Sequence, residues 1–389
     1  MPYRFISPIR MIRRGRAAFL PVSFPRNAMP RMPFLRQAGC IPHCVPQPFQ
    51  PQRVPMKSIP VPQPARRAAL AFCLVTAFGA IAGNAAAADK VTFLTSWYAQ
   101  AEHGGFYQAV AEGIYRKHGL DVTIRMGGPQ VNGMQLLATG QADFFMGYDL
   151  QVLKSVEQGI PATTVAASFQ TDAQGMMTHT DVKGLAGLKN GKTVLVSTSG
   201  RTTWWPWLKA KYGLTEAQGR PYTFNLQPFL ADPDFAQQAY PSSELFQAAK
   251  AGAKTNFYLF ANDGYPPYGT TVVAMQKLVK EKPDLVARFV RASMEGWKSY
   301  LANPAPANAL IKKENPNMKD DQLAYAVGKL KEYSFVTGGD AAQQGIGTMT
   351  DARWQRTYEF MVSAGLLKKE TDWKQAYTTQ FVRDLKVMP

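Results

Sequence analysis

The segment KVTFLTSWYAQAEHGGFYQAVAEGIYRKHGLDVTIRM, residues 90–126, predicts the fold class on its own. Its first part, residues 90–97, is rich in β-branched and aromatic side chains and predicts a strand. Apolar side chains then recur at helical spacing over 105–118, and Gly119 follows as a helix-ending residue. Residues 121–126 predict a second strand. A strand, a helix and a strand in this order are typical of two parallel strands joined by a helix.

The same alternation continues outward from this segment. Gly127-Gly128-Pro129 is predicted to open a second helix, because proline suits the first turn of a helix. Strands are predicted over 142–148 and 163–169, with a helix over 150–158 between them. This order predicts an α/β fold with a parallel sheet that helices cover on both faces.

A second α/β unit is predicted to begin near residue 181. It has a strand over 193–197, a tryptophan-rich helix and another strand over 222–226. Glycines and prolines interrupt the aromatic stretch 257–268, which is interpreted as a crossover. The predicted tail helices cover 283–301, 319–333 and 351–364. Two α/β units with a helical tail predict two lobes with a cleft between them.

The positive charge of the chain is concentrated at its N-terminal end. The 389 residues carry 44 Lys and Arg against 27 Asp and Glu, a net charge of +17. Residues 1–88 hold twelve of the basic side chains and none of the acidic ones. Residues 89–389 therefore carry 32 basic and 27 acidic side chains, a net charge of +5. Because nucleic-acid binding needs a basic patch or stripe, the main body gives no electrostatic indication of a nucleic-acid partner.

Residues 56–88 have the three parts of a secretory signal peptide. Arg66 and Arg67 precede an apolar run over 68–81, and the alanines at 85–88 provide a small-residue cleavage site. The apolar run is too short to span a membrane. We expect export to the periplasm, with cleavage after Ala88.

Residues 1–55 are rich in Pro and Arg and precede this complete signal peptide. We expect translation to start at Met56, or the extension to be removed with the signal peptide. A disordered arm that stays on the mature protein is the alternative.

The cysteine and histidine positions restrict the chemistry of the main body. Cys40, Cys44 and Cys73 all precede residue 89, which excludes a disulfide, a thiolate metal site and a cysteine nucleophile after it. The histidines of the main body are His103, His118 and His179. They are far apart in sequence, so no metal site is predicted. No G-x-S-x-G, Walker or H-E-x-x-H motif occurs, so no catalytic residue and no cofactor are predicted.

Three loops that follow predicted strands are candidate ligand contacts, because open α/β sheets bind ligands at the carboxyl ends of their strands. These loops cover residues 97–107, 127–132 and 197–203. Helix N-termini at Gly128 and Gly200 could hold an anionic group. Each such loop, taken alone, is also ordinary turn chemistry.

Aromatic and acidic side chains extend this candidate site. Trp204, Trp205 and Trp207 cannot share one helix face, because successive residues are about 100° apart. We expect at least one ring to face away from the local core, where a planar ligand could stack on it. An aromatic cluster that packs the lobes is the alternative. Glu244 could accept a hydrogen bond from a ring amine, or it could be a helix-starting acid after the two serines before it.

A series of short motifs resembles one family. The motifs are Ser96-Trp97-Tyr98, Glu102-His103-Gly104-Gly105-Phe106-Tyr107, Gly113-Ile114-Tyr115, Gly119-Leu120-Asp121-Val122, Gly140-Gln141-Ala142-Asp143 and Gly159-Ile160-Pro161. Over residues 89–389 the chain resembles the periplasmic binding components of ABC importers in the sulfonate, nitrate and thiamine-precursor group. It is most similar to the binders of thiamine pyrimidine precursors.

The resemblance implies a two-lobed, type II periplasmic-binding architecture with a ligand cleft between the lobes. Lobe I would hold residues 89–177 and 266–389, and lobe II residues 178–265. The protein would be a monomer that captures a small heterocyclic ligand by hinge closure and delivers it to an ABC permease at the inner membrane. A sulfonate or nitrate ligand remains an alternative. The expected ligand-binding residues are Trp97, Tyr98, His103, Gly104, Asn132, Tyr148, Ser199, Gly200, Trp204, Trp205, Glu244 and Tyr268.

The same superfamily contains an enzyme, the yeast-type hydroxymethylpyrimidine phosphate synthase. In that enzyme a Met-Gly-x stretch leads to the pyridoxal lysine, and a histidine follows four residues later. Here Met146-Gly147-Tyr148 leads to Asp149, with Leu153 in place of the histidine. The cysteine-rich run of the synthase is Ala261-Asn262-Asp263-Gly264-Tyr265 in this chain. We therefore favour a binding protein over an enzyme.

Overall fold

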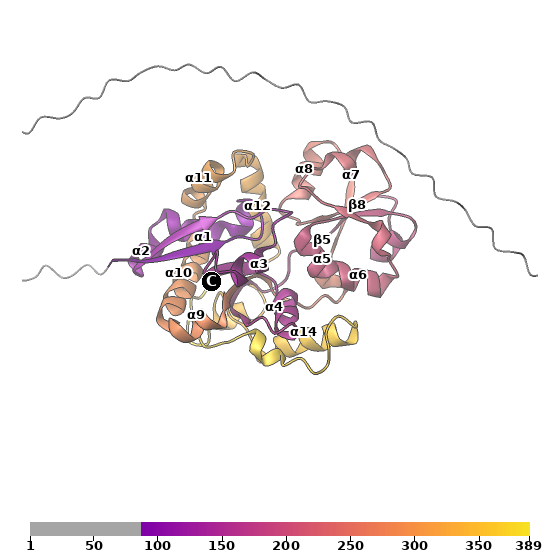
Figure 1. The fold of residues 1–389 in the computed structure, drawn as a ribbon. Helices are drawn as coiled ribbons and strands as arrows, with labels where there is room; N and C mark the ends of the chain where they lie inside the picture. Colours follow the sequence, from indigo (N-terminus) through magenta and orange to yellow (C-terminus); the bar gives the residue numbers. More distant parts are fainter. Residues whose placement is uncertain (1–86) are drawn as a thin grey trace, which may run out of the picture. The chain divides into compact units, whose positions relative to one another are not determined.

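The computed structural model describes residues 87–389, which Figure 1 draws in colour. The N-terminal extension over 1–55 and all but the last two residues of the expected signal peptide lie outside the described residues. The described part contains two five-stranded sheets. Lobe I denotes the sheet that contains β1 together with its helices, and lobe II denotes the other sheet with its helices.

The sheet of lobe I takes strands from two distant parts of the sequence. It consists of β1 (Asp89–Leu94), β2 (Leu120–Arg125), β3 (Phe144–Gly147), β4 (Ala162–Phe169) and β10 (Gly269–Met275), in the order β2-β1-β3-β10-β4. β1 is parallel to β2 and β3, whereas β10 is antiparallel to β3 and β4. The predicted α/β fold is confirmed. The prediction of a purely parallel sheet is wrong, because β10 inserts between β3 and β4.

Close helix packing positions the first loop of lobe I. Helix α1 (Gly104–Ala111) packs against α10 (Pro283–Ala302), beside which it lies in Figure 1. Glycine permits this approach, since a Cβ on Gly296 would lie 2.2 Å from the carbonyl oxygen of Gly105. The predicted helix over 105–118 is in fact two helices. Gly113 adopts a left-handed φ of 67° and separates α1 from α2 (Ile114–Lys117).

Further helices complete lobe I. They are α3 (Gly133–Ala138), α4 (Asp149–Glu157), α9 (Gln276–Glu281), α11 (Ala305–Glu314), α12 (Asp320–Glu332), α13 (Ala341–Gln344) and α14 (Asp351–Ser363). The three predicted tail helices correspond to α10, α12 and α14, whereas α11 was not predicted. Helix α3 begins after the Gly-Gly-Pro turn that was predicted to open it. The reason is a local cap, since Asn132 Oδ1 accepts a hydrogen bond from the N–H of Gln135 at 3.3 Å.

Lobe II is built on the second mixed sheet. Its strands are β5 (Gly175–His179), β6 (Thr193–Val196), β7 (Gly219–Pro221), β8 (Phe235–Ala239) and β9 (Thr255–Leu259), in the order β7-β6-β8-β5-β9. Its helices are α5 (Thr198–Thr202), α6 (Trp204–Tyr212), α7 (Gln227–Ala231) and α8 (Glu244–Lys250). Two predictions were wrong here. The strand expected over 222–226 lies earlier in the chain, since β7 ends at Pro221. The crossover expected over 257–268 starts later than predicted, because residues 257–259 still belong to β9.

The tryptophans of α6 are all buried, so the expectation that one of them faces away from the core is wrong. Residues distant in sequence cover this helix. The ring of Phe260 lies 5.0 Å from that of Trp204, and the ring of Tyr265 lies 5.0 Å from that of Trp207. Trp205 donates its indole N–H to Glu216 at 3.1 Å. The alternative interpretation, aromatic rings that pack the lobes, describes this helix.

The described chain crosses between the lobes over residues 170–174 and 260–268. Arg353 of α14 contacts both crossings: its guanidinium donates to the carbonyl oxygen of Gln170 at 3.1 Å and to that of Pro266 at 2.6 Å. The N–H of Tyr268 donates to Asp149 Oδ2 at 2.8 Å. These bonds attach both crossings to lobe I and define the hinge region.

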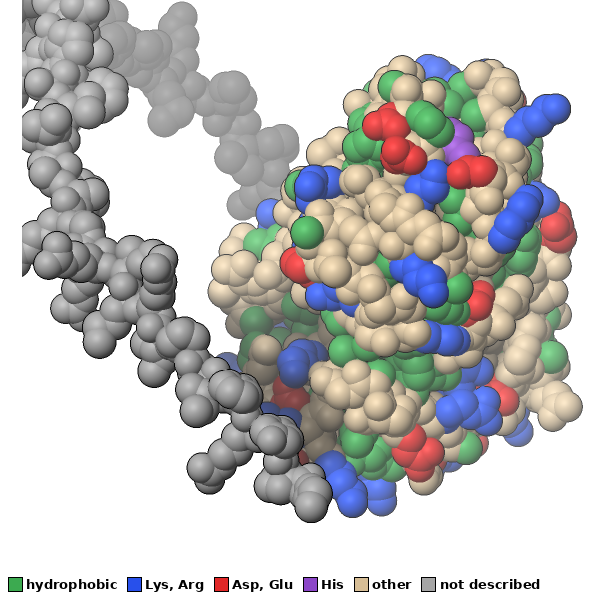
Figure 2. All heavy atoms as spheres, turned by 90° about the vertical axis from the view of Figure 1, so that its right-hand side faces the viewer, with side chains coloured by type: hydrophobic (Ala, Val, Ile, Leu, Met, Phe, Trp, Pro, Cys, Tyr) green, Lys and Arg blue, Asp and Glu red, His purple; other side chains and the backbone are tan. Residues whose placement is uncertain are grey.

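The surface of the described residues carries charges of both signs. Figure 2 shows basic and acidic side chains interspersed over one face, without a continuous field of either sign. Within residues 87–389, no helix combines the length and the apolar character that crossing a bilayer requires.

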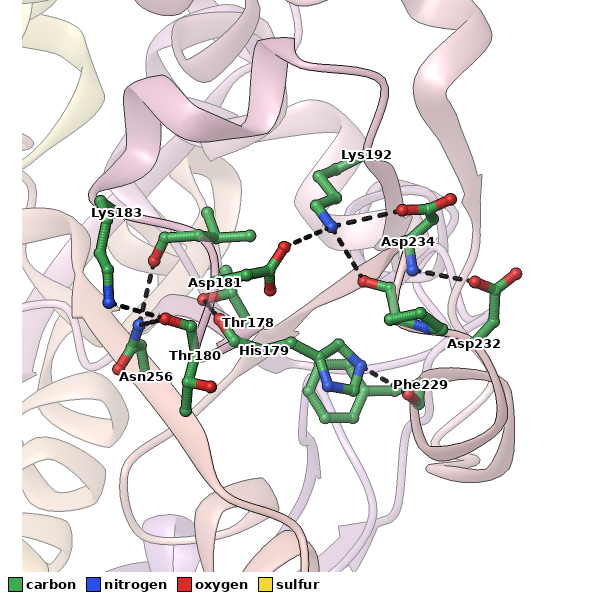
Figure 3. A network of polar contacts seen from close by, with 12 residues as sticks. Thr178, His179, Thr180, Asp181, Lys183, Lys192, Phe229, Asp232, Asp234 and Asn256 are labelled. Carbon is green, nitrogen blue, oxygen red and sulfur yellow. Dashed lines mark hydrogen bonds and ion pairs between the residues drawn. The ribbon is translucent and has the colours of Figure 1, made fainter.

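A polar network around Lys192 supports one end of the lobe II sheet (Figure 3). Lys192 is 8% exposed, and its ammonium group donates to Asp181 Oδ2 at 2.9 Å, to the Pro233 carbonyl at 3.1 Å and to Asp234 Oδ1 at 3.3 Å. Hydrogen bonding to Asp181 raises the pKa of Lys192 above its usual value. The network connects the segments that precede β6 and β8 to the segment that follows β5.

Replacing Lys192 by Met is expected to lower the Tm of the protein by about 2–5 °C, because the substitution removes the donor shared by these three acceptors. Thermal unfolding followed by circular dichroism measures the effect. Lys183→Met is the control, since Lys183 is exposed and donates to the Thr180 carbonyl alone among the described residues. Equal Tm values for the two variants would contradict the prediction.

Candidate functional site

A cavity lies between the lobes, where the carboxyl ends of strands from both sheets meet. The space left free for water-sized molecules inside it is about 30 Å³. Lobe I and the first crossing contribute Ser96, Trp97, Gln100, Glu102, His103, Met146, Tyr148, Gln174 and Thr270. Lobe II contributes Ser199, Gln238, Ala239, Tyr240 and Glu244.

Two buried glutamates, one from each lobe, line the cavity. Glu244 is the first residue of α8 and accepts hydrogen bonds from the Tyr222 hydroxyl at 2.8 Å and from the N–H of Tyr240 at 2.9 Å. Burial raises the pKa of Glu244 to about 7. Glu102 accepts a hydrogen bond from the hydroxyl of Ser242 across the lobe boundary, and burial raises the pKa of Glu102 as well. Both carboxyl groups can accept hydrogen bonds from a ligand.

Two further buried side chains present unused polar atoms. His103 is 1% exposed, and burial lowers its pKa to about 3, so its imidazole is neutral. Among the described residues, His103 Nδ1 and Gln100 Oε1 have no hydrogen-bond partner. Because buried polar atoms are normally paired, these two atoms are candidate hydrogen-bonding partners of a ligand.

Aromatic rings form the walls of the cavity. Trp97 and Tyr148 come from lobe I and Tyr240 from lobe II. The hydroxyls of Tyr148 and Tyr240 lie 3.1 Å apart and bridge the lobes. Such walls suit a planar ligand, which can stack against one ring and contact another at its edge.

Within residues 87–389, the ionisable side chains that line the cavity include carboxylic acids but no strong base. Among the described residues no Lys or Arg lines it, while two carboxyl groups do. An anion placed here would lose its hydration without gaining a cationic partner. A ligand that presents N–H or O–H donors, or a positive charge, fits these surroundings better.

Five of the twelve residues expected to bind ligand line this cavity. They are Trp97, His103, Tyr148, Ser199 and Glu244. Trp97, His103 and Ser199 lie in loops that were singled out as candidate ligand contacts, whereas Tyr148 follows β3 and Glu244 begins α8.

The other seven expected residues lie outside the cavity lining, each for a structural reason. Gly104 is in contact with the Tyr300 ring, Asn132 caps α3, and Gly200 lies against the Trp204 indole. Trp204 and Trp205 are packed in the core of lobe II. Tyr268 belongs to the hinge region, where its hydroxyl accepts a hydrogen bond from the N–H of Thr350 at 3.1 Å. Tyr98 lies next to Trp97, with ring centroids 6.3 Å apart, but does not line the cavity.

Several cavity residues were not predicted. Gln100, Gln174 and Gln238 are glutamines without a surrounding motif, and folding alone brings them together. Tyr240 lies four residues before Glu244, which was predicted to bind ligand. Thr270 has a left-handed φ of 50° at the start of β10, a strand that sequence analysis had not assigned. For these residues, the sequence offered one indication of a place in the site, which is that Tyr240 is close in sequence to Glu244.

Within residues 87–389, His, Cys, Asp and Glu side chains form no group of three that could hold a metal ion.

Comparison with known proteins identifies the family. A family model described as NMT1/THI5 like matches residues 100–307, which is more than half of the chain. The chain belongs to the NMT1/THI5-like family. A similar protein is the riboflavin-binding protein RibY of Chloroflexus aurantiacus, 27% identical over 304 residues that cover 76% of this chain and 86% of RibY. The formylaminopyrimidine-binding protein of Halalkalibacterium halodurans is 23% identical over 66% of this chain and 82% of its own length.

A solved structure supports the fold of this NMT1/THI5-like chain. The periplasmic aliphatic sulphonate binding protein SsuA from Escherichia coli matches with a TM-score of 0.55 at 13% sequence identity, covering 74% of this chain and 91% of SsuA. At this identity the likeness concerns the fold alone. The fold is that of periplasmic binding proteins, and the resemblance that the motifs indicated is confirmed.

Proposed function

We propose that this chain is the solute-binding component of an ABC importer and that it captures a small heterocyclic ligand in the periplasm. The observation that carries this proposal is the cavity between the lobes, with aromatic walls and two buried carboxyl groups. Relatives that bind riboflavin and formylaminopyrimidine support a heterocyclic ligand. The protein would act as a monomer, reach the periplasm through the signal peptide over 56–88, and pass its ligand to a permease in the inner membrane.

The cavity suggests how the ligand is held. Trp97 and Tyr148 would face the ring, while Glu244 and Glu102 would accept hydrogen bonds from its amino, imino or hydroxyl groups. Gln100 Oε1 and His103 Nδ1 would gain the partners that they lack in the structure. Because no Lys or Arg among the described residues lines the cavity, we favour these heterocycles over sulfonate or nitrate.

Closure of the two lobes would trap the ligand. The structure is in a closed arrangement, since hydrogen bonds cross the lobe boundary at several points. The N–H of Thr198 donates to the Pro129 carbonyl at 2.9 Å, and Gln151 Nε2 donates to Thr202 Oγ1 at 3.1 Å. Separation of the lobes would break these bonds and expose the cavity. A permease that contacts both lobes would therefore distinguish the loaded, closed form from the open one.

Binding without turnover is the second part of the proposal. The positions that carry lysine and histidine in the pyrimidine phosphate synthase are Asp149 and Leu153 here. Asp149 is buried and accepts the N–H of Tyr268, and Leu153 belongs to the apolar core. Neither side chain lines the cavity.

A thermal-shift assay of the full chain tests the proposal. We expect riboflavin or an aminopyrimidine such as 4-amino-5-hydroxymethyl-2-methylpyrimidine to raise Tm by about 5 °C at a concentration of 100 Kd. Methanesulfonate and nitrate serve as controls and are expected to leave Tm unchanged. A shift with the anions alone would contradict the ligand class. Formation of a pyrimidine phosphate from pyridoxal phosphate and iron would contradict binding without turnover.

A further inference from the structure

Four aromatic side chains meet where the two lobes touch beside the cavity. Trp97 and Tyr98 come from lobe I, and Tyr222 and Phe224 come from the loop of lobe II that follows β7. The rings of Trp97 and Tyr222 are stacked, with centroids 5.9 Å apart and planes at 21°. Phe224 meets Trp97 edge-on at 5.9 Å and Tyr98 at 5.7 Å. We call these four residues the aromatic cluster.

The backbone of Phe224 is in a conformation that its side chain disfavours. Its φ is 60°, in the left-handed region where Cβ crowds the following carbonyl group of an L-residue. For a bulky residue outside a glycine turn this conformation is an outlier, and it persists only where the surroundings impose it. Two of the three rings that contact Phe224, those of Trp97 and Tyr98, belong to the opposite lobe.

The aromatic cluster is connected to the ligand cavity. Trp97 lines the cavity directly. Tyr222 is buried behind it and donates its hydroxyl to Glu244 at 2.8 Å, and Glu244 also lines the cavity. Gln130 of lobe I donates its side-chain amide to the Tyr222 carbonyl at 3.0 Å, two residues before Phe224. A ligand held by Trp97 and Glu244 would therefore stabilise the same contacts that hold Phe224.

We propose that Phe224 is a strained latch of the closed state and that it sets the rate at which the ligand leaves. In the closed state, Trp97 and Tyr98 hold its ring, and the contacts of the ring impose the left-handed backbone. When the lobes separate, both contacts are lost and the backbone returns to an ordinary conformation. The ring thus opposes opening, while relief of its backbone strain favours opening. The ligand-release part of this inference rests on the proposed function, whereas the opening of the lobes does not.

Inter-lobe distances test the latch without a ligand. The full chain, with Cys40, Cys44 and Cys73 replaced by Ser, would carry spin labels at positions 117 and 189, which are exposed and lie one in each lobe. We expect Phe224→Ala to raise the ratio of open to closed molecules about tenfold. Phe257→Ala is the matched control, because it removes a half-buried ring of lobe II outside the aromatic cluster and should leave the ratio unchanged. An unchanged ratio in Phe224→Ala would overturn the proposal.

Comparison of alanine with glycine tests the strain. Both substitutions remove the ring, but glycine adopts a left-handed backbone without the cost that alanine carries. If the strain exists in the closed state and is relieved on opening, Phe224→Gly is about fivefold less open than Phe224→Ala. Equal ratios for these two variants would show that φ stays positive in both states and would overturn the strain part of the proposal.

Riboflavin is the kinetic probe, because its fluorescence would be quenched when its ring stacks on a tryptophan. We expect Phe224→Ala to raise its dissociation rate about tenfold in stopped-flow displacement, in proportion to the larger open fraction. A wild-type dissociation rate in a variant that opens more would contradict control of release by Phe224. If riboflavin does not bind to the wild-type chain, that result counts against riboflavin as the ligand of the proposed function. The inter-lobe distances then decide whether Phe224 stabilises the closed state.

Discussion

Replacing Trp97 by Ala is expected to weaken ligand binding about 100-fold. The Trp97 ring lines the cavity and stacks on Tyr222 of the other lobe, so the substitution removes both a wall for the ligand and a contact of the closed state. Truncation of a central aromatic contact in a binding site costs about 2–4 kcal/mol, and each 1.4 kcal/mol is a factor of about ten. Isothermal titration with the heterocycle that gives the largest thermal shift measures the change in Kd.

The control for this prediction is Trp373→Ala. Trp373 is also half-buried and stacks on a tyrosine, Tyr377, with centroids 5.9 Å apart, but it lies outside the cavity lining. Its substitution is expected to leave Kd unchanged. Trp97→Phe retains a ring and is expected to retain most of the affinity. A folded Trp97→Ala variant with wild-type affinity would contradict the placement of the ligand between the lobes.

Replacing Asp149 by Asn is expected to stabilise the protein increasingly as the pH rises. Asp149 begins α4, is fully buried, and holds the second crossing by accepting the N–H of Tyr268. Burial raises its pKa from 3.8 to about 8. Between these two values the folded state keeps a proton that the unfolded state releases, so the stability present below about pH 4 is lost as the pH rises toward 8. Asparagine is neutral at every pH and avoids this loss.

The expected difference grows by about 1.4 kcal/mol per pH unit in this range, which makes the Tm of Asp149→Asn about 10 °C higher than wild type at pH 8. At pH 4 the two proteins are expected to unfold at nearly equal temperatures, which is the internal control. Burial also raises the pKa of Asp172 and of Glu244 to about 7, and these groups contribute to the wild-type pH dependence with the same sign. A constant difference in Tm from pH 4 to pH 8 would contradict the prediction.

Local patterns predicted the elements whose sequences carry their own periodicity. The first strand, helix and strand of lobe I and the long α10 are examples. Strand β10 was not predicted, because polar and apolar residues do not alternate in its buried run Thr271-Val272-Val273-Ala274. The periodicity of such a short apolar run does not distinguish a strand from a helix. Its partners β3 and β4 are 100 or more residues earlier in the chain, so no local signal indicates the pairing.

The sequence predicted those residues of the candidate site that lie at the ends of predicted strands. Trp97, Tyr148 and Ser199 lie where strands end and so reach one cavity. Trp204 and Trp205 were wrongly predicted to line the cavity, because helix geometry gives the direction of a side chain but not the residues that cover it. Phe260, from a later segment, covers Trp204. The glutamines of the cavity have no sequence signal, because their role depends on which atoms the fold leaves unpaired.

The position of β10 has a consequence for the order in which the molecule assembles. Since β10 separates β3 from β4, the first sheet lacks its connecting strand until residue 275 is available, after all of lobe II. Lobe II can form its own sheet from a continuous stretch of chain, whereas lobe I needs contacts of high sequence separation, which form slowly. During synthesis the first lobe therefore remains incomplete for longest.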